Sequence, residues 1–268
     1  MPKYALCVGC NYPGTGSELY GCVNDAEDWS TVLAERGYEV DTLFNEEATA
    51  AEILSKLAAM VSRCEYGDIA CFTFSGHGSW VPDESGDEPD GRDEVICPAD
   101  IEQGIWISDD QLAEVFAERA RGARVVMLAD SCHSGTVSRL STALRPHERA
   151  SKIRFLPPEV FYGRNSPEIL DVRGIGSRPA KAAGSSASLL ISGCKDTEYS
   201  YDAWFGDRAN GAFTRAAIDA LKEVHATASY AEWHRKIRTK LPSASYPQTP
   251  QLLAAGFQKK WPALGEGR

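Results

Sequence analysis

The 268-residue sequence lacks several features that would assign it to a broad class of protein. No apolar run approaches the roughly 18 residues that a membrane-spanning helix needs, so we expect no membrane partner. The first residues lack the apolar stretch and small-residue cleavage site of a secretory signal, which predicts a cytoplasmic protein. Basic residues are too few for a general nucleic-acid binder, because Lys and Arg total 28 against 38 Asp and Glu, a formal net charge of -10.

Motifs for common cofactors are also missing. No group of His and Cys residues has the spacing of a zinc site. The Gly14-x-Gly16 pair lacks the residues that follow it in a phosphate-binding or dinucleotide-binding loop. Eight cysteines are present, and most lie in apolar runs, so we expect free, buried thiols. Cys7 and Cys10 lie three residues apart in a predicted strand and face opposite ways, which favours core packing over a redox pair.

What the sequence does contain is an alternation of strand and helix patterns. The predicted strands are 4–10, 38–44, 68–75, 123–129, 187–192 and 251–255. The predicted helices cover 24–36 with Asn24 as N-cap, a segment opening at Thr49-x-x-Glu52, a segment opening at Ser108-x-x-Gln111, 210–224 and 229–241. This alternation predicts one α/β domain over residues 1–268, with about six mostly parallel strands covered by helices on both faces. Residues 134–186 lose this periodicity and form an irregular basic insertion.

Two of the predicted strands end in reactive residues. The third ends in Ser75-Gly76-His77-Gly78, and the fourth ends in Asp130-Ser131-Cys132-His133-Ser134-Gly135. If these strands are neighbours, Cys132 can act as a thiolate nucleophile and His77 as its general acid and base. The backbone N–H groups of Gly78 and Cys132 are then candidates to hold the oxyanion. His133 is the weaker partner, because adjacent residues in an extended chain point in opposite directions.

The SGHG and DSCHSG motifs, at this spacing, resemble those of the caspase-like cysteine peptidases, and within them the metacaspases and their bacterial relatives. Further stretches resemble the same family: GCVNDA at 21–26, DGRDE at 90–94, CPAD at 97–100, NGAFT at 210–214 and PQTPQL at 247–252. The resemblance implies a caspase–haemoglobinase-like three-layer sandwich. It also implies a cysteine endopeptidase that cleaves basic polypeptides after Arg or Lys.

A pocket for a basic side chain needs carboxylates near the nucleophile, and Asp25 and Asp130 are the candidates. The resemblance implies that the pocket is lined by Cys22, Asp25, Ser75 and Asp130. Other interpretations are a helix-start charge for Asp25 and a turn residue for Asp130. Asp202, Trp204 and Glu198 could shape outer subsites, although we favour surface-loop positions for them.

The family resemblance also raises the question of calcium. The family's ligand positions match Asp93, Asp109 and Asp110, and a fourth falls on Arg139, a cation that cannot ligate calcium. Either Arg139 replaces the ion through salt bridges, or other acids such as Asp87 or Asp90 complete the site. We favour an enzyme that requires no cofactor.

The basic insertion follows the predicted nucleophile directly. Its bases are Arg139, Arg145, Arg149, Lys152, Arg154, Arg164, Arg173, Arg178 and Lys181. An exposed and flexible basic loop is a natural self-substrate for such a peptidase, so we expect self-cleavage or autoinhibition there. Two alternatives stay open: a non-cleaving caspase-fold module that binds basic peptides, and a non-peptidase cysteine hydrolase. We expect a monomer.

Overall fold

A computed structural model describes residues 1–83, 91–132, 151–162 and 188–265. Within these residues a six-stranded sheet has the strand order β12-β9-β7-β3-β1-β2. Its strands are β1 (Lys3–Gly9), β2 (Glu39–Phe44), β3 (Ile69–Ser75), β7 (Arg124–Asp130), β9 (Leu189–Ser192) and β12 (Gln251–Leu253). All neighbouring pairs are parallel except β12 with β9. The predicted, mostly parallel sheet is therefore confirmed.

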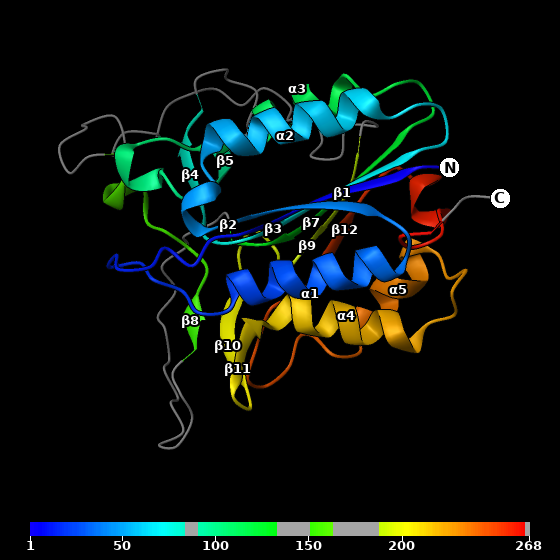
Figure 1. Ribbon diagram of the computed structural model, residues 1–268. Helices are drawn as coiled ribbons and strands as arrows, with labels where there is room; N and C mark the ends of the chain where they lie inside the picture. The colour runs from blue at the N-terminus through cyan, green and yellow to red at the C-terminus, as the bar shows by residue number, and fades with distance from the viewer. Residues whose placement is uncertain (84–90, 133–150, 163–187, 266–268) are drawn as a thin grey trace.

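Helices cover both faces of this sheet (Figure 1). One face carries α2 (Ala50–Arg63) and α3 (Asp109–Ala117), and the other carries α1 (Cys22–Glu35), α4 (Ala212–Glu223) and α5 (Tyr230–Ile237). Short 3-10 helices are Asn45–Glu47, Ile101–Gln103, Pro158–Val160 and Gln258–Lys260. The arrangement is the predicted three-layer sandwich. Of the helices in the described ranges, none combines the length and apolar character needed to cross a membrane.

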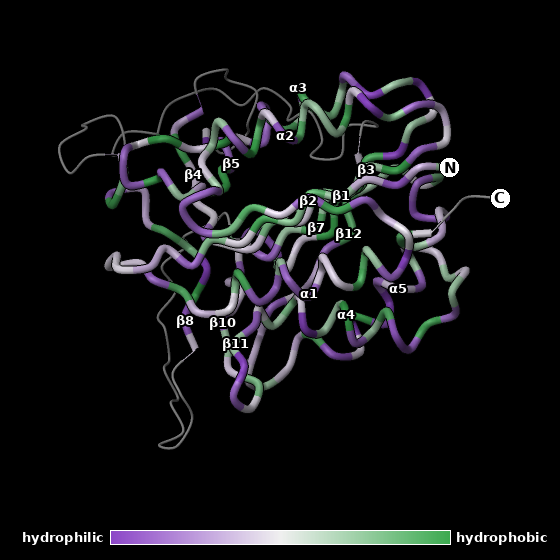
Figure 2. The backbone as a smooth tube through the Cα atoms, in the orientation of Figure 1, coloured by the Kyte–Doolittle hydropathy of each residue, from purple (hydrophilic) through white to green (hydrophobic). Residues whose placement is uncertain are grey.

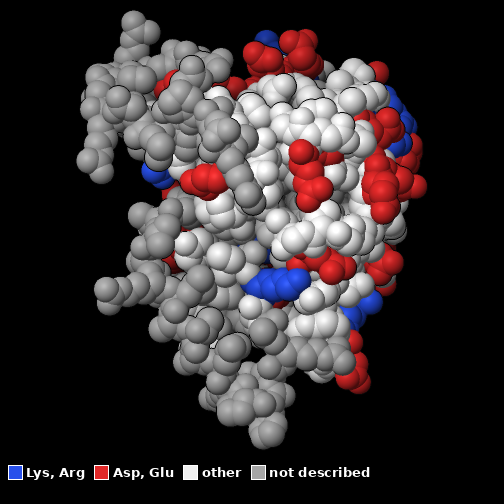
Figure 3. All heavy atoms as spheres, turned by 90° about the vertical axis from the view of Figure 1, so that its left-hand side faces the viewer, with Lys and Arg blue, Asp and Glu red and all other residues white. Residues whose placement is uncertain are grey.

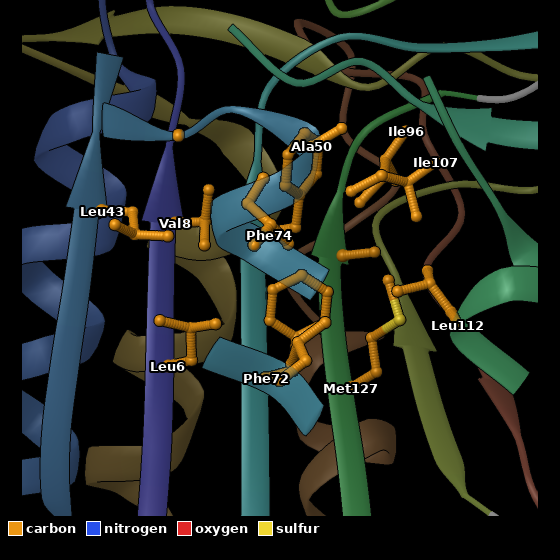
Figure 4. Close-up of a cluster of buried hydrophobic side chains, with 14 of the residues drawn as sticks. Leu6, Val8, Leu43, Ala50, Phe72, Phe74, Ile96, Ile107, Leu112 and Met127 are labelled. Carbon is orange, nitrogen blue, oxygen red and sulfur yellow. The ribbon is translucent and has the colours of Figure 1, made fainter. Parts of the chain in front are cut away.

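Two hydrophobic clusters lie on the two faces of the sheet. On the α2 and α3 face, Phe72, Phe74 and Met127 pack with residues from both helices (Figure 4). On the other face, Trp29 of α1 meets Trp233 of α5 edge to face at 6.2 Å. Figure 2 shows much of the hydrophobic colour along the central strands. Cys7 and Cys10 fall into different clusters, as the alternation of strand side chains predicts.

The helix starts follow their capping signals, with one exception. The side chains of Thr49, Ser108 and Ser229 each accept the backbone N–H three residues on, as predicted. The prediction that Asn24 caps the first helix was wrong, because α1 already begins at Cys22. The Asn11 side chain accepts hydrogen bonds from the first α1 amides instead. The amide of Asn24 is engaged elsewhere, since it donates to the carbonyl of Ala209.

Two small sheets flank the carboxyl ends of the central strands (Figure 1). One contains β4 (Gly78–Pro82), β5 (Arg92–Ile96) and β6 (Ile107–Ser108), and the other contains β8 (Lys152–Ile153), β10 (Tyr201–Phe205) and β11 (Arg208–Gly211). The sequence did not predict these strands, because segments of two to five residues are too short to show a period. β8 lies inside the predicted basic insertion, of which 134–150 and 163–186 fall outside the described residues.

Candidate active site

The two reactive loop tips lie side by side at the carboxyl edge of the sheet. β3 and β7 are parallel neighbours, with Ser75 and Asp130 level with one another. Two residues beyond each come His77 and Cys132. The backbone N–H groups of Gly78 and Cys132 both donate to the carbonyl oxygen of Arg154, at 3.0 Å and 3.2 Å. The structure therefore brings both tips together around one carbonyl group, in the manner of an oxyanion site.

His77 is held in one orientation. Its Nε2 lies 2.7 Å from the carbonyl oxygen of Ser17, and its ring packs at 4.9 Å against Tyr12. A carbonyl oxygen can only accept, so Nε2 carries the proton and Nδ1 keeps its lone pair. No hydrogen-bond partner reaches the buried Nδ1 within the described part of the chain. Burial lowers the pKa of His77 to about 4, which keeps the ring neutral near pH 7.

Cys132 is fully buried in this arrangement. Its sulfur accepts the backbone N–H of Ser200 and lies 3.6 Å from the Ser200 carbonyl oxygen. Among the residues described, Cys132 and His77 share no direct hydrogen bond; the Arg154 carbonyl accepts the N–H of Cys132 itself and that of Gly78, which follows His77. His133, the weaker candidate for the base, falls outside the described residues.

The side chain of Arg154 fills a pocket of carboxylates. Its Nη2 lies 2.7 Å from Asp25 and 3.0 Å from Asp202, and its Nη1 lies 3.3 Å from Asp130. These three acids, which we call the acidic pocket, are at most 2% exposed, and Arg154 is 0% exposed. The expectation of an exposed basic loop was thus wrong at this position, because the arginine finds three buried countercharges.

Two of the three pocket acids, Asp25 and Asp130, are held by one C-terminal motif. The side-chain amide of Asn210 and the N–H of Gly211 donate to Asp25 at 3.0 Å and 2.9 Å. The N–H and hydroxyl of Thr214 both donate to Asp130 at 2.8 Å. A Cβ at Gly211 would lie 2.0 Å from an Asp130 oxygen, so only glycine fits there. The NGAFT motif therefore serves to hold the pocket acids.

Asp202 corrects one sequence interpretation. It was favoured as a surface-loop residue, but it lies on β10 and is only 2% exposed. Besides Arg154, its carboxylate accepts the backbone N–H groups of Tyr20 and Gly21 at 2.8 Å and 2.9 Å. Glu198 accepts hydrogen bonds from Thr249. The local sequence carries no sign of this role for Asp202, because only the fold brings β10 beside α1.

The other two predicted pocket residues, Cys22 and Ser75, neighbour Asp25 and Asp130 in the fold. Cys22 begins α1, and Ser75 ends β3 level with Asp130. Both are buried, but within the described ranges the hydrogen bonds of the Arg154 guanidinium go to other residues. Burial raises the pKa of the Cys22 thiol well above its usual value, and the charge of Arg154 opposes this rise. The thiol is therefore near enough to the pocket to sense its cation.

The family of the chain follows from comparison with known proteins. Residues 3–141 match the family model described as the metacaspase, peptidase C14 domain. The chain belongs to the metacaspase family. Metacaspase-1 of Cryptococcus neoformans var. neoformans serotype D (strain JEC21) is 32% identical over 94% of this chain and 62% of its own length. Metacaspase-1B of Aspergillus fumigatus is 32% identical over 93% of this chain and 69% of its own length.

Solved structures resemble the chain in fold. The crystal structure of protein GSU0716 from Geobacter sulfurreducens superposes with a TM-score of 0.75 at 32% identity, covering 100% of both chains. Caspase-1 from Spodoptera frugiperda matches with a TM-score of 0.57 at 12% identity, covering 100% of this chain and 90% of its own, and so shares the fold. This metacaspase chain spans under two thirds of the length of the Cryptococcus relative.

The charges of the acidic pocket do not balance. Three carboxyl groups surround one guanidinium in this metacaspase, and all four groups are buried. Burial raises the pKa of Asp25 to about 7; Arg154 opposes this shift and the neighbouring Asp130 carboxylate adds to it. A proton on Asp25 thus relieves part of the excess negative charge. The described surface on this side of the molecule is also richer in Asp and Glu than in Lys and Arg (Figure 3).

The acids proposed for calcium lie on neighbouring elements. Asp93 is on β5, whose Val95 pairs with Ser108, and Ser108 immediately precedes Asp109 and Asp110 at the start of α3. Across the described ranges, no group of three or more His, Cys, Asp or Glu residues is placed to hold a metal ion. The other predicted positions, Arg139, Asp87 and Asp90, fall outside those ranges. Within the described ranges, Asp93, Asp109 and Asp110 are therefore not grouped as ligands of one ion.

Proposed function

We propose that this metacaspase chain is a cysteine endopeptidase that cleaves peptide bonds after Arg or Lys. One observation carries the proposal. The side chain of Arg154 lies in the acidic pocket while its carbonyl oxygen accepts the N–H groups of Gly78 and Cys132. An arginyl substrate bound in the same way presents its carbonyl carbon beside the Cys132 sulfur, which is the geometry that thiol attack requires.

Each side chain then has one task in the reaction. The Cys132 thiol loses its proton to Nδ1 of His77, and the sulfur forms a bond to the substrate carbonyl carbon. The carbonyl oxygen becomes an oxyanion held by the two backbone N–H groups, and loss of one such donor typically costs 10²–10³-fold in rate, roughly. His77 returns the proton to the leaving amine as the carbon–nitrogen bond breaks. Water then hydrolyses the thioester and releases the acid.

The geometry favours Arg over Lys at the cleavage position. The two terminal nitrogens of Arg154 reach different carboxylates, one pairing with Asp130 and the other with both Asp25 and Asp202. The planar guanidinium fork suits such divided bonding, whereas a lysine ammonium is a single point charge. We therefore expect both residues to be accepted, with the higher kcat/KM for Arg.

Under this proposal, the bond after Arg154 occupies the cleavage position. Arg154 is followed by Phe155, and beyond the bond between them Leu156 is anchored. The Leu156 N–H donates to the Gly78 carbonyl at 3.0 Å, its carbonyl accepts the Ser79 hydroxyl at 2.6 Å, and its side chain is 2% exposed. The bond between Arg154 and Phe155 is therefore our candidate for self-cleavage, and until it is cut Arg154 blocks the acidic pocket.

The self-cleavage proposal has a direct test. Wild-type protein and a Cys132→Ala variant are purified side by side, incubated, and analysed by intact mass and N-terminal sequencing. We expect only the wild type to yield a fragment that begins with Phe155. A fragment produced equally by Cys132→Ala, or one that begins elsewhere, contradicts the assignment.

The peptidase proposal is tested separately with fluorogenic peptides that end in Arg, Lys or Asp. We expect turnover of the Arg and Lys peptides and none of the Asp peptide, with no turnover by Cys132→Ala. Labelling of Cys132 by an arginyl thiol-reactive probe without any turnover would instead support a module that binds basic peptides. Turnover that ignores the basic residue would support a non-peptidase hydrolase.

The cellular compartment and the oligomeric state of the enzyme are also part of this proposal. The eight free, buried thiols support a reducing compartment such as the cytoplasm. We expect a monomer, which size-exclusion chromatography with light scattering can verify.

A further inference from the structure

The residues before Arg154 bind as an added strand. Lys152 and Ile153 form β8 antiparallel to β10, with Tyr201 opposite Ile153 and Asp202 opposite Lys152. The Arg154 N–H continues the ladder by donating to the Ser200 carbonyl at 2.9 Å. In such strand addition the main chain supplies affinity, while alternate side chains meet the receptor surface and supply specificity. Lys152 and Arg154 are the alternate pair here.

Lys152 meets a site of its own outside the acidic pocket. Its Nζ lies 4.0 Å from the centre of the Tyr20 ring and donates to the Glu18 carbonyl. An aromatic face attracts a cation, and a carbonyl oxygen can only accept a hydrogen bond, so both partners suit an ammonium or guanidinium group. A carboxylate at this position would meet the same two electron-rich partners, which would repel it.

The position of Tyr20 is fixed relative to the acidic pocket. Its backbone N–H donates to Asp202, the same carboxylate that binds Arg154. Its ring packs at 5.9 Å against Trp204, two residues further along β10. The Tyr20 side chain is nevertheless 40% exposed, so an incoming chain can reach it. The spacing between the two cation sites is thus set by one strand and one shared carboxylate.

We propose that Tyr20 and the Glu18 carbonyl form a second cation-binding subsite, which selects Lys or Arg two residues before the Arg at which the chain is cut. This inference rests on the proposed cleavage after Arg. It defines the substrates more closely, as polypeptides in which a basic residue and then any residue precede the Arg at the cleavage site. The sequence Lys152-Ile153-Arg154 is the internal example of that pattern. Tyr20 is then a specificity-determining residue rather than a catalytic one.

The test uses four acetylated fluorogenic peptides that differ at single positions. The parent ends in Gly-Lys-Ile-Arg, two others replace the Lys by norleucine or Glu, and the last replaces the Arg by norleucine. Norleucine keeps the length of the lysine side chain and removes its charge. Values of kcat/KM are compared for the full-length wild type, Tyr20→Phe and Tyr20→Leu. A Tyr66→Leu variant is the control, because Tyr66 is 82% exposed and precedes the opposite end of β3.

In the wild type we expect kcat/KM for the parent peptide to be about three- to ten-fold higher than for its norleucine analogue. This factor corresponds to a partly exposed cation–π contact plus one charged hydrogen bond. The peptide with Glu in place of Lys should have a lower kcat/KM than the norleucine peptide. The preference should persist in Tyr20→Phe and Tyr66→Leu and become clearly smaller in Tyr20→Leu, in which only the hydrogen bond to the Glu18 carbonyl remains. Because each value is a ratio within one preparation, differences in the fraction of active enzyme cancel.

Two results would overturn the subsite while leaving the proposed function intact: equal kcat/KM for the Lys and norleucine peptides in the wild type, or a preference that is undiminished in Tyr20→Leu. The peptide in which norleucine replaces the final Arg tests the acidic pocket separately, because only its kcat/KM depends on the loss of that guanidinium. The same peptides carried on a thiol-reactive ketone give labelling rates at Cys132, so a protein that binds without turnover is still measured. Failure to cleave or label with any arginyl peptide refutes the proposed function itself.

Discussion

Arg154 links the stability of the protein to the occupancy of its acidic pocket. A substitution of Arg154→Gln removes the cation and leaves Asp25, Asp130 and Asp202 facing one another in a buried space. Glutamine can donate to one carboxylate but carries no charge. Removing one partner of a buried ion pair typically costs about 3–5 kcal/mol, because the remaining charge stays buried without compensation.

The matched control is Arg208→Gln. Arg208 also binds two acids, with Asp28 at 2.9 Å and Glu27 at 3.4 Å, but its side chain is 46% exposed. Ion pairs of that kind contribute about 0–1 kcal/mol. The two substitutions are thus the same chemical change in a buried and in a solvated setting. Both are made in a Cys132→Ala background, so that self-cleavage does not enter the comparison.

The assay is urea unfolding at pH 5 and at pH 8. Burial raises the pKa of Asp25 and Arg154 opposes this rise, so without the cation the folded protein keeps a proton on Asp25 that the unfolded chain releases. Its stability therefore falls as the pH rises, and the cost of Arg154→Gln should be larger at pH 8 than at pH 5. An arginine ester should restore about 2.7 kcal/mol at 100 times its dissociation constant.

Equal and small losses for Arg154→Gln and Arg208→Gln would refute this reasoning, because they would show that Arg154 does not compensate the pocket charges in solution. A loss that the arginine ester fails to restore would refute the narrower claim that the pocket accepts a free arginyl group.

Four further predictions concern catalysis. Asp130→Ala should abolish turnover of arginyl peptides, and full activity would remove Asp130 from the pocket. In the wild type, KM for arginyl peptides should rise as the pH falls through about 7, because protonation removes the charge of Asp25. The Asp25→Asn variant should show no such rise. The same pH profile of KM in both proteins would contradict this prediction. His77→Ala should lower kcat by about 10²–10⁴-fold in stopped-flow or steady-state assays. Initial rates with a calcium chelator and with added calcium should be equal, and a strict calcium requirement would show that acids beyond those described complete a site.

The sequence was informative where a pattern is local. The capping residues Thr49, Ser108 and Ser229 and the buried run of β3 follow from spacing and hydrophobicity alone. The reactive residues His77 and Cys132 could be placed together because parallel neighbouring strands end at the same edge of a sheet.

Contacts between residues far apart in the sequence could not be predicted from it. Arg154 is one base among nine in a segment without periodicity, and nothing local distinguishes it from an exposed arginine. Asp202 becomes a pocket residue only because β10 packs beside the start of α1. The contact between His77 and Ser17 uses a backbone carbonyl, which every residue has, so the identity of the side chain carries no information about it.

The anchoring of Leu156 determines what a cut after Arg154 would leave behind. The piece starting at Phe155 contributes β9 and β12 to the central sheet and is already embedded at its first residues. The new carboxyl end at Arg154 is held by the pairing of β8 with β10 and by the ion pairs of the acidic pocket. A nicked molecule should therefore travel as one particle in native chromatography and come apart only in denaturant.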